Sequence, residues 1–368
     1  MAKPVIPVIS FEPFLNGQAA DRKMVAEQVY AAFRDIGFMY VKDTGISQAR
    51  IDELFALAKD FFDLPLDFKQ RYALRDPTEN QGYSAQGKDM GFDHESKAMK
   101  KDYKEAYEHR RYKNELCPTA EELAAYNPRI SDFHAILDGF YKEAFKLSEE
   151  VLACLALALD LPGGEEYFKP ITGDSDPQLR LLHYPPVPAS AIAAATAQDG
   201  AGKDGRIRPH CDYSLCTLLF QDSIGGLEID PFHTGKFTPA PPKSGTVLIN
   251  IGDLLHRLLN GRVKSTMHRV VAPEAFTSED GSEPILPSRY SIPFFVHPVP
   301  EALIEPILLD PAEKKMYKEV NAGDWRSWRT ARNYMMPERE QYFLDKLGIA
   351  HELPQNAAAL GCVTAGGN

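Results

Sequence analysis

Apolar residues in the first part of the chain recur mainly at helical spacing. The segments 21–37 and 47–65 place them three or four positions apart, which predicts two amphipathic helices, the first ending at Gly37. Short apolar runs at 7–10 and 38–43 predict strands that alternate with these helices.

The spacing of apolar residues changes twice further along the chain. A long amphipathic pattern predicts a helix from about Ile130 to Leu161, where the sequence LPGGEE ends it. From 178 to 306 the apolar runs become short and are separated by Gly, Pro and Asp, which is typical of a barrel or a two-sheet jelly roll. Helical spacing returns in 311–352.

These patterns predict a mainly β protein with flanking helices. We expect residues 1–125 to form an N-terminal layer of helices and strands, and residues 126–306 to hold the long support helix and the β core. Residues 307–368 would form a C-terminal helical cover. The three parts are expected to pack as one body.

Three segments show neither the helical nor the strand-like spacing of apolar residues clearly. Residues 74–118 carry many turn-forming side chains and are expected to be rich in loops. The basic run at 97–113 is interleaved with carboxylates, so we expect it to be a solvated face. Residues 188–205, rich in Ala and Gly, are expected to form a mobile surface loop.

An imidazole and a carboxylate stand two positions apart where a strand is predicted, in RPHCDYSLCTLLFQD. His210 and Asp212 would share a strand face, and burying them is costly unless they pair with each other or a metal ion lies between them. His268 enters a later strand and offers a third donor. Two histidines and one carboxylate on one side of an ion is the geometry of oxygen-activating Fe(II) sites, whereas zinc enzymes with similar ligands usually leave one position open. We expect the following histidines to be solvated or structural: His94, His109, His134, His233, His256, His297 and His351.

A second pair of polar residues lies on the later predicted strand SRYSIPFF. Arg289 and Ser291 share a face of this strand, and a guanidinium beside a hydroxyl suits the distal carboxylate of a 2-oxoacid. A surface ion pair is the alternative for Arg289. Tyr184, in LLHYPP, offers a phenol as a further contact to the same ligand.

Composition is that of a globular protein, with 368 residues, 44% hydrophobic and 25% charged. The net charge of -11 argues against a surface for nucleic acid or anionic membranes. Five cysteines without close pairs look like reduced thiols, and neither a signal peptide nor a membrane span is evident. We therefore expect a cytoplasmic enzyme or binding protein for a small molecule, with no obligate protein partner.

Nearly the whole chain resembles the 2-oxoglutarate and Fe(II)-dependent dioxygenases of the isopenicillin N synthase-like group. The N-terminal stretches IPVISF, AFRDIGFMYVKDTGI and FFDLPLDFKQRY look like the first part of that family. The stretches LRLLHYPP, HCDY, LLFQDSIGGLEI, VLINIGDLL, STMHRVV and RYSIPFF look like its catalytic core, in the usual order. The resemblance implies a double-stranded β-helix core, Fe(II), 2-oxoglutarate as cosubstrate and O2.

The resemblance also implies roles for individual residues. It assigns iron binding to His210, Asp212 and His268, and 2-oxoglutarate binding to Arg289, Ser291 and Tyr184. Many members carry an Asn where this chain has Leu182, so one cosubstrate contact would be missing. The segment 273–287 looks like an enlarged loop at the mouth of the site.

Several stretches are most similar to thymine 7-hydroxylase and related microbial, especially fungal, enzymes. In that enzyme two aromatic residues hold a pyrimidine, and the matching positions here are Tyr213 and Phe295. Both are aromatic, which suits a flat substrate such as a pyrimidine or a secondary metabolite. The alternative is that Phe295 belongs to the core and Tyr213 is simply a wall of the pocket.

The expected reaction is oxidation, most simply hydroxylation, of a substrate C–H bond with formation of succinate and CO2. No side chain is needed as a general acid or base. Three alternatives remain: an oxidase of the same fold that uses no 2-oxoglutarate, a ring-forming or desaturating enzyme, and a non-catalytic binder. The complete set of three donors argues against the last of these.

Overall fold

We describe the architecture from a computed structural model. Among the residues that it describes, no helix is both long and apolar enough to cross a membrane. The described residues are 5–76, 81–85, 90–93, 98–101, 104–111, 116–188, 205–271, 284–334 and 336–353. Of the segments expected to be loops at 188–205 and 273–287, residues 189–204 and 273–283 therefore lie outside this part of the chain.

The larger of the two sheets is mostly antiparallel and has eight strands within the described residues. Strands from the start of the chain extend it at both edges, so the N-terminal segment and the β core share one sheet. In order across the sheet they are β1 (Val8–Ser10), β2 (Phe38–Lys42), β13 (Thr246–Ile251), β10 (Cys216–Gln221), β16 (Arg289–Val296), β7 (Gln178–Tyr184), β6 (Glu105–Arg110) and β3 (Gly82–Ser84).

A smaller sheet of four strands faces one side of the larger sheet, and a cavity lies between them. Its strands, in order, are β12 (Thr238–Pro239), β11 (Leu227–Asp230), β14 (Met267–Val271) and β9 (Gly205–His210). The remaining strands form short pairs: β8 (Val187–Pro188) with β15 (Ile285–Leu286), β17 (Leu303–Ile304) with β18 (Val320–Asn321), and β4 (Met90–Asp93) with β5 (Ala98–Lys101).

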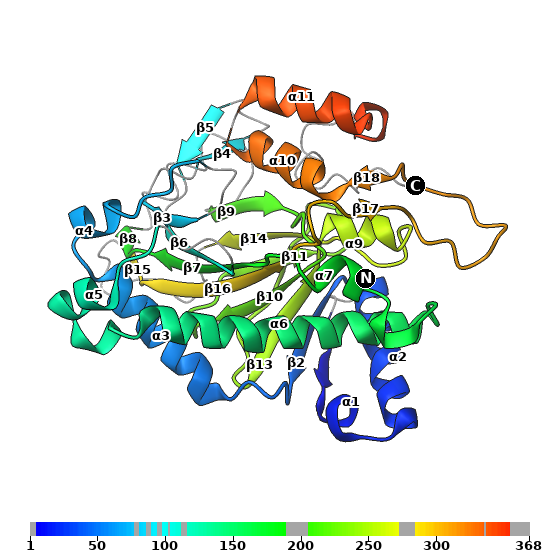
Figure 1. Cartoon of the computed structure of the whole chain (residues 1–368), viewed down its shortest axis with the longest axis horizontal. Helices are drawn as coiled ribbons and strands as arrows, with labels where there is room; N and C mark the ends of the chain where they lie inside the picture. Colours follow the sequence, from blue (N-terminus) through cyan, green and yellow to red (C-terminus); the bar gives the residue numbers. More distant parts are fainter. Residues whose placement is uncertain are drawn as a thin grey trace.

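Helices cover both sides of this sandwich (Figure 1). The long helix α6 runs across the outer face of the larger sheet, while α10 and α11 lie on the opposite side, beyond β9 and β14. The helices are α1 (Glu12–Asn16), α2 (Ala19–Asp35), α3 (Gln48–Phe62), α4 (Leu66–Gln70), α5 (Ala120–Tyr126), α6 (Phe133–Ala158), α7 (Lys169–Thr172), α9 (Asp253–Leu258), α10 (Ala322–Asn333) and α11 (Pro337–Leu347).

The alternation of side chains along β16 explains how one sheet serves both layers. Ile292 and Phe294 point into the hydrophobic core, where the Phe294 ring meets Tyr141 of α6 edge to face at 5.0 Å between centroids. Ser291 and Phe295 point the other way and line the cavity. Since side chains alternate along a strand, the packing on α6 determines which residues face the site.

The structure corrects two expectations for the region 74–118. This region contributes β3 and β6 to the larger sheet, and β4 pairs with β5, so it holds more strand than the turn residues suggested. The second half of the basic run is not a solvated face, because all of β6 is buried. Its carboxylates have partners: Glu105 binds Lys69, and Glu108 binds Arg180. Ion pairing therefore permits burial of a charged sequence.

The expectation that the cysteines are reduced thiols is only partly confirmed. Cys154 and Cys216 are not disulfide-bonded, as expected, whereas Cys211 is.

Candidate active site between the two sheets

Strand pairing in the smaller sheet brings the two candidate histidines together. His210 is the last residue of β9 and stands opposite His268 of β14 in the antiparallel register. Their ring centroids are 4.3 Å apart. Asp212 lies just beyond β9, and its backbone carbonyl accepts a hydrogen bond from the backbone N–H of Asp253 at 2.8 Å. The chain after the strand is thus held at the start of α9.

The donor atoms of these three side chains converge within 4.8 Å of one another. The Asp212 Oδ1 atom lies 3.9 Å from His210 Nε2 and 3.8 Å from His268 Nε2. Each imidazole uses its other nitrogen for a backbone carbonyl, His210 Nδ1 on Arg208 at 2.8 Å and His268 Nδ1 on Thr266 at 3.1 Å. With Nδ1 as the N–H donor, both Nε2 atoms keep a lone pair that faces Oδ1.

The second carboxylate oxygen of Asp212 is held by the larger sheet. Thr217 Oγ1 and Asn250 Nδ2 each donate to Asp212 Oδ2 at 2.7 Å, from opposed positions on β10 and β13. These two donors leave Oδ1 directed at the histidines. They therefore orient the carboxylate, as partners of metal-binding side chains commonly do.

Electrostatics favour the protonation states that a metal ion requires. Burial and the neighbouring His268 lower the pKa of His210, so its imidazole is neutral at neutral pH. Burial acts to raise the pKa of Asp212, but the two histidines and the hydrogen bonds from Asn250 and Thr217 prevail and lower it. A neutral imidazole and an ionised carboxylate are the forms in which histidine and aspartate bind a divalent ion. The residues present thus fit Fe(II) with a two-histidine, one-carboxylate ligand set.

The residues expected to bind a 2-oxoacid lie on the facing sheet. Arg289 of β16 pairs with Tyr184 of β7, and the guanidinium carbon is 4.8 Å from the centroid of the Tyr184 ring. Arg289 Nη1 donates to Ser291 Oγ at 3.2 Å, and Nε donates to the carbonyl of Gly225 at 2.8 Å. All three predicted side chains are buried and line the same cavity as His210.

A second buried guanidinium stands beside this group, and our interpretation of the sequence missed it. Arg206 of β9 lies 5.8 Å from the Tyr184 ring centroid, and its Nη2 donates to the carbonyl of Pro287 at 2.9 Å. Its Nε and Nη1 atoms are buried without a hydrogen-bond partner among the described residues. Burial and the positive charge of Arg289 lower the pKa of Arg206 to about 10. No spacing in the sequence pointed to Arg206, because an irregularity between His210 and Ile207 breaks the alternation of side chains along β9.

The predicted substrate residues lie on the cavity wall but are joined by a third ring. Tyr213 and Phe295 both line the cavity, and His297 lies beside each, at centroid distances of 5.8 and 6.5 Å. His297, expected to be solvated or structural, is buried and also lines the cavity. Leu182, where many relatives carry an Asn, is part of the wall as well. The cavity has a volume of about 260 Å³, which suits a small molecule.

Two known families match the chain, one in its N-terminal part and one in its C-terminal part. Residues 6–130 match the family described as "non-haem dioxygenase in morphine synthesis N-terminal". Residues 175–298 match the 2OG-Fe(II) oxygenase superfamily.

Similar proteins include fungal enzymes and solved structures. A 2-oxoglutarate-dependent dioxygenase of Dothideomycetidae sp. (strain 11243) is 31% identical over 83% of this chain and 89% of its own length. A proline hydroxylase of Petromyces alliaceus is 30% identical, over 89% and 98% of the two chains. The crystal structure of Neurospora crassa thymine 7-hydroxylase with alpha-KG and 5-formyluracil is 32% identical, covers 89% of this chain and 96% of its own, and gives a TM-score of 0.75. The chain therefore belongs to the 2-oxoglutarate- and Fe(II)-dependent dioxygenases, oxidoreductases that require Fe(II), 2-oxoglutarate and O2, and its facing sheets are the double-stranded β-helix of that family.

Proposed function

We propose that this protein hydroxylates a C–H bond of a small, flat substrate, with Fe(II) held by His210, Asp212 and His268. The observation that carries the proposal is the convergence of His210 Nε2, Asp212 Oδ1 and His268 Nε2 in one cavity. A ligand set on one side of the ion leaves the cavity side for cosubstrate and oxygen. Bound there, the iron would supply the oxidising chemistry, with 2-oxoglutarate converted to succinate and CO2.

Arg289, Ser291 and Tyr184 are proposed to bind 2-oxoglutarate. The buried guanidinium of Arg289 offers charge-assisted hydrogen bonds to the distal carboxylate, and Ser291 Oγ, 3.2 Å from Arg289 Nη1, offers another. Arg206, with two buried donor atoms unpartnered in the described part of the chain, adds positive charge beside Tyr184 and strengthens the preference for a dianion. In a buried site such a preference is strong, because little water screens it.

The contribution of the chain to the reaction is positioning and exclusion of water. Thr217 and Asn250 keep Asp212 Oδ1 turned toward the two imidazoles. Apolar side chains such as Leu182 and Leu219 line the cavity and keep water from the reacting C–H bond. None of the proposed steps needs a side chain that takes up or releases a proton.

The cavity wall formed by Tyr213, His297 and Phe295 favours binding of a flat substrate. Cations flank the wall: the Arg180 guanidinium carbon is 5.6 Å from the Phe295 centroid, and that of Arg329 is 5.4 Å from the Tyr213 centroid. Rings provide stacking area, and guanidinium groups favour carbonyl or carboxylate oxygens on the substrate. The related thymine 7-hydroxylase of Neurospora crassa has been solved with thymine and with 5-formyluracil, which are flat and rich in carbonyl groups. A pyrimidine or an oxygenated aromatic metabolite therefore fits the proposal.

The test is an anaerobic titration of the Fe(II)-loaded protein with 2-oxoglutarate, followed by visible metal-to-ligand charge-transfer absorption. We expect a band that saturates. Arg289→Ala should need about 10- to 100-fold more 2-oxoglutarate, since charged hydrogen bonds contribute about 1.5–3 kcal/mol. Arg129→Ala, which removes an exposed partner of Asp60, should titrate like the unchanged protein. Iron binding without a band would contradict binding of 2-oxoglutarate to the iron and would favour an oxidase that uses no 2-oxoglutarate.

Substrate screening follows once the band is seen. Thymine and flat aromatic metabolites would be supplied with 2-oxoglutarate and O2, and succinate and the oxidised product would be measured together. Hydroxylated product in equal amount to succinate supports the proposal. A dehydrogenated or cyclised product would instead favour the desaturating or ring-forming alternative.

A further inference from the structure

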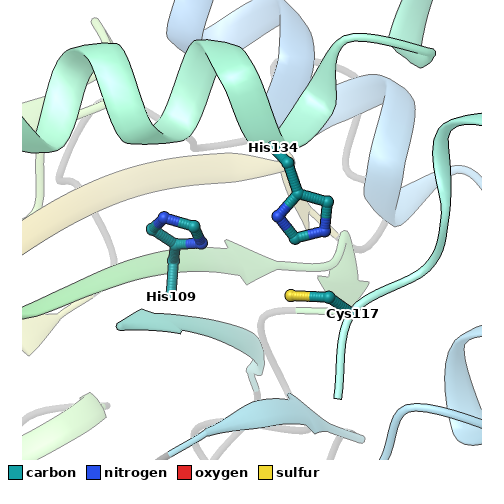
Figure 2. Close-up of side chains that lie close together, drawn as sticks. All are labelled: His109, Cys117 and His134. Atoms are coloured by element: carbon teal, nitrogen blue, oxygen red, sulfur yellow. The ribbon is translucent and has the colours of Figure 1, made fainter. Parts of the chain in front are cut away.

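A second cluster of metal-binding side chains lies outside the cavity (Figure 2). His109 belongs to β6, Cys117 lies between β6 and α5, and His134 is in the first turn of α6. Each offers one donor atom, and the three atoms lie within 4.8 Å of one another. None of the three residues lines the cavity that holds His210. Both histidines were expected to be solvated or structural.

His109 is arranged as a metal-binding histidine would be. Its side chain is 0% exposed, and its Nε2 lies 2.8 Å from Asp138 Oδ1. An ionised carboxylate only accepts, so Nε2 carries the proton and Nδ1 keeps a lone pair. That Nδ1 atom is buried, has no hydrogen-bond partner in the described part of the chain, and points toward His134 and Cys117. A carboxylate behind a histidine is the usual arrangement at metal sites.

His134 adds a second nitrogen without a partner. Its Nε2 atom is buried and makes no hydrogen bond within the described residues. The two imidazole rings are 5.8 Å apart between centroids, yet no hydrogen bond joins His109 Nδ1 to His134 Nε2. Burial lowers the pKa of both His109 and His134, so both are neutral and able to bind a cation. Buried nitrogens without a hydrogen-bond partner, such as His109 Nδ1 and His134 Nε2 in the described part of the chain, are costly without a ligand.

Cys117 supplies the sulfur. Its Sγ atom lies 2.8 Å from the hydroxyl of Tyr107, a buried residue of β6. Burial raises the pKa of Tyr107 well above its ordinary value, so the phenol keeps its proton and can donate to a thiolate. Asp138 behind His109 and Tyr107 beside Cys117 would thus orient two of the three ligands.

We propose that His109, Cys117 and His134 bind a zinc ion. Imidazole nitrogen and thiolate sulfur are the donors that zinc prefers in proteins, at bond lengths of about 2.0–2.3 Å. Tetrahedral zinc at those bond lengths requires donor atoms about 3.3–3.8 Å apart, so the side chains would close slightly from their present separation. Binding forms two Zn–N bonds and one Zn–S bond and releases the Cys117 thiol proton to solvent. Water would occupy the fourth position.

The position of the cluster indicates a structural role for the ion. Zinc there would link β6, in the larger sheet, to the start of α6 and to the segment that precedes α5. Metal binding to a folded site stabilises it relative to the unfolded chain. This proposal does not depend on the proposed hydroxylase function.

The experiment uses full-length protein with Asp212→Ala, so that the cavity site no longer competes for the metal. After removal of metals, one equivalent of zinc should bind, as measured by elemental analysis. Co2+ in place of zinc should give a thiolate-to-cobalt charge-transfer band in the near ultraviolet. Adding Cys117→Ser should abolish that band and weaken zinc binding at least about 10-fold, whereas Cys154→Ser, at a buried cysteine of α6, should leave both unchanged.

A second variant distinguishes loss of the zinc site from misfolding. His134→Gln, at a partly buried position, should retain the circular dichroism spectrum of the parent but lose the rise in Tm that zinc gives. A band that persists in Cys117→Ser would place the metal on another thiol and overturn the proposal. Absence of zinc binding by the Asp212→Ala protein would overturn it equally, and neither result would bear on the Fe(II) titration.

Discussion

Asp212 shows how single hydrogen bonds determine the direction of a candidate metal ligand. Its Oδ2 accepts from Thr217 and Asn250, so only Oδ1 faces the histidines. Removal of one donor would let the carboxylate rotate away from the ion. Side chains that never touch the metal can therefore control its affinity.

Thr217→Val tests this at nearly constant shape, because Val has a methyl group where Thr has the hydroxyl. We expect Fe(II) to bind about 10- to 100-fold more weakly, the usual effect of losing such a partner. Thr217→Ser keeps the hydroxyl and should bind iron nearly as tightly as the unchanged protein. The measurement is an anaerobic Fe(II) titration; equal affinity in the Val and Ser variants would show that the hydroxyl does not orient Asp212.

At this scale the sequence predicted which side chains share a strand face but not which ones meet across strands. Alternation placed Arg289 with Ser291 on β16, whereas Asp212 was expected on the strand of His210 and instead lies just beyond its end. The partners Thr217 and Asn250 meet Asp212 only because β10 pairs with β13, and that register is not written in local spacing. A single Asn inside the apolar run TVLINI was the available sign of a buried polar role.

Helix α10 contacts the chain between two of the candidate metal ligands, His210 and Asp212. Arg329 projects from it and donates to the buried carboxylate of Asp253 and, at 3.1 Å, to the carbonyl of Cys211. Burial raises the pKa of Asp253, and the Arg329 charge opposes that rise. Since the backbone of Asp253 also holds Asp212, α10 stabilises the loop that carries the candidate ligands.

Arg329→Met should lower the free energy of unfolding by about 3–5 kcal/mol, since it leaves the Asp253 carboxylate buried without its cation. Arg339→Met, on the neighbouring helix, removes an exposed pair with Asp76 and should cost less than about 1 kcal/mol. Urea unfolding of both variants and of the unchanged protein measures the two losses in the free energy of unfolding. Equal losses would mean that the buried pair contributes no more than a surface pair.

Elements with a long periodic pattern were predicted best. The expected helix at Ile130–Leu161 corresponds to α6, Phe133–Ala158. The C-terminal helical pattern is divided into α10 and α11, because Pro337 cannot continue a helix but can begin one. The strands β3 and β6 were missed, since their polar side chains are buried by pairing with residues elsewhere in the chain.

At the scale of the whole molecule, a buried polar network joins the N-terminal helices to the larger sheet. Glu105 of β6 binds Lys69 of α4 at 2.9 Å, the Tyr83 hydroxyl of β3, and His183 Nδ1 of β7 at 2.7 Å. Burial acts to raise the pKa of Glu105, but the hydrogen bonds from these partners prevail and lower it below 4.5. The charged carboxylate thus stabilises the folded state.

This pKa shift sets a pH dependence of stability. Because the folded-state pKa lies below the unfolded value, the contribution of Glu105 is complete above about pH 4.5 and is lost as pH falls through the folded pKa. Glu105→Gln should therefore cost about 3 kcal/mol at neutral pH and less in acid.

Urea unfolding of the two proteins at neutral pH and well below pH 4.5 measures that difference. Glu305→Gln, at an exposed partner of Lys315, provides a matched control with little expected effect at either pH. A cost for Glu105→Gln that does not shrink in acid would contradict the assigned direction of the pKa shift.

The sequence alone determined the family, the β core with its covering helices, and the candidate residues on each strand, because these depend on local periodicity and on motif order. The division at 125 and 306 stays a prediction. Only the tertiary structure decided what lies across from each strand: Thr217 and Asn250 behind Asp212, Arg206 beside Arg289, and Cys117 beside two histidines. The physical reason is that pairing register and helix packing join residues far apart in the chain, and no local pattern records those distances.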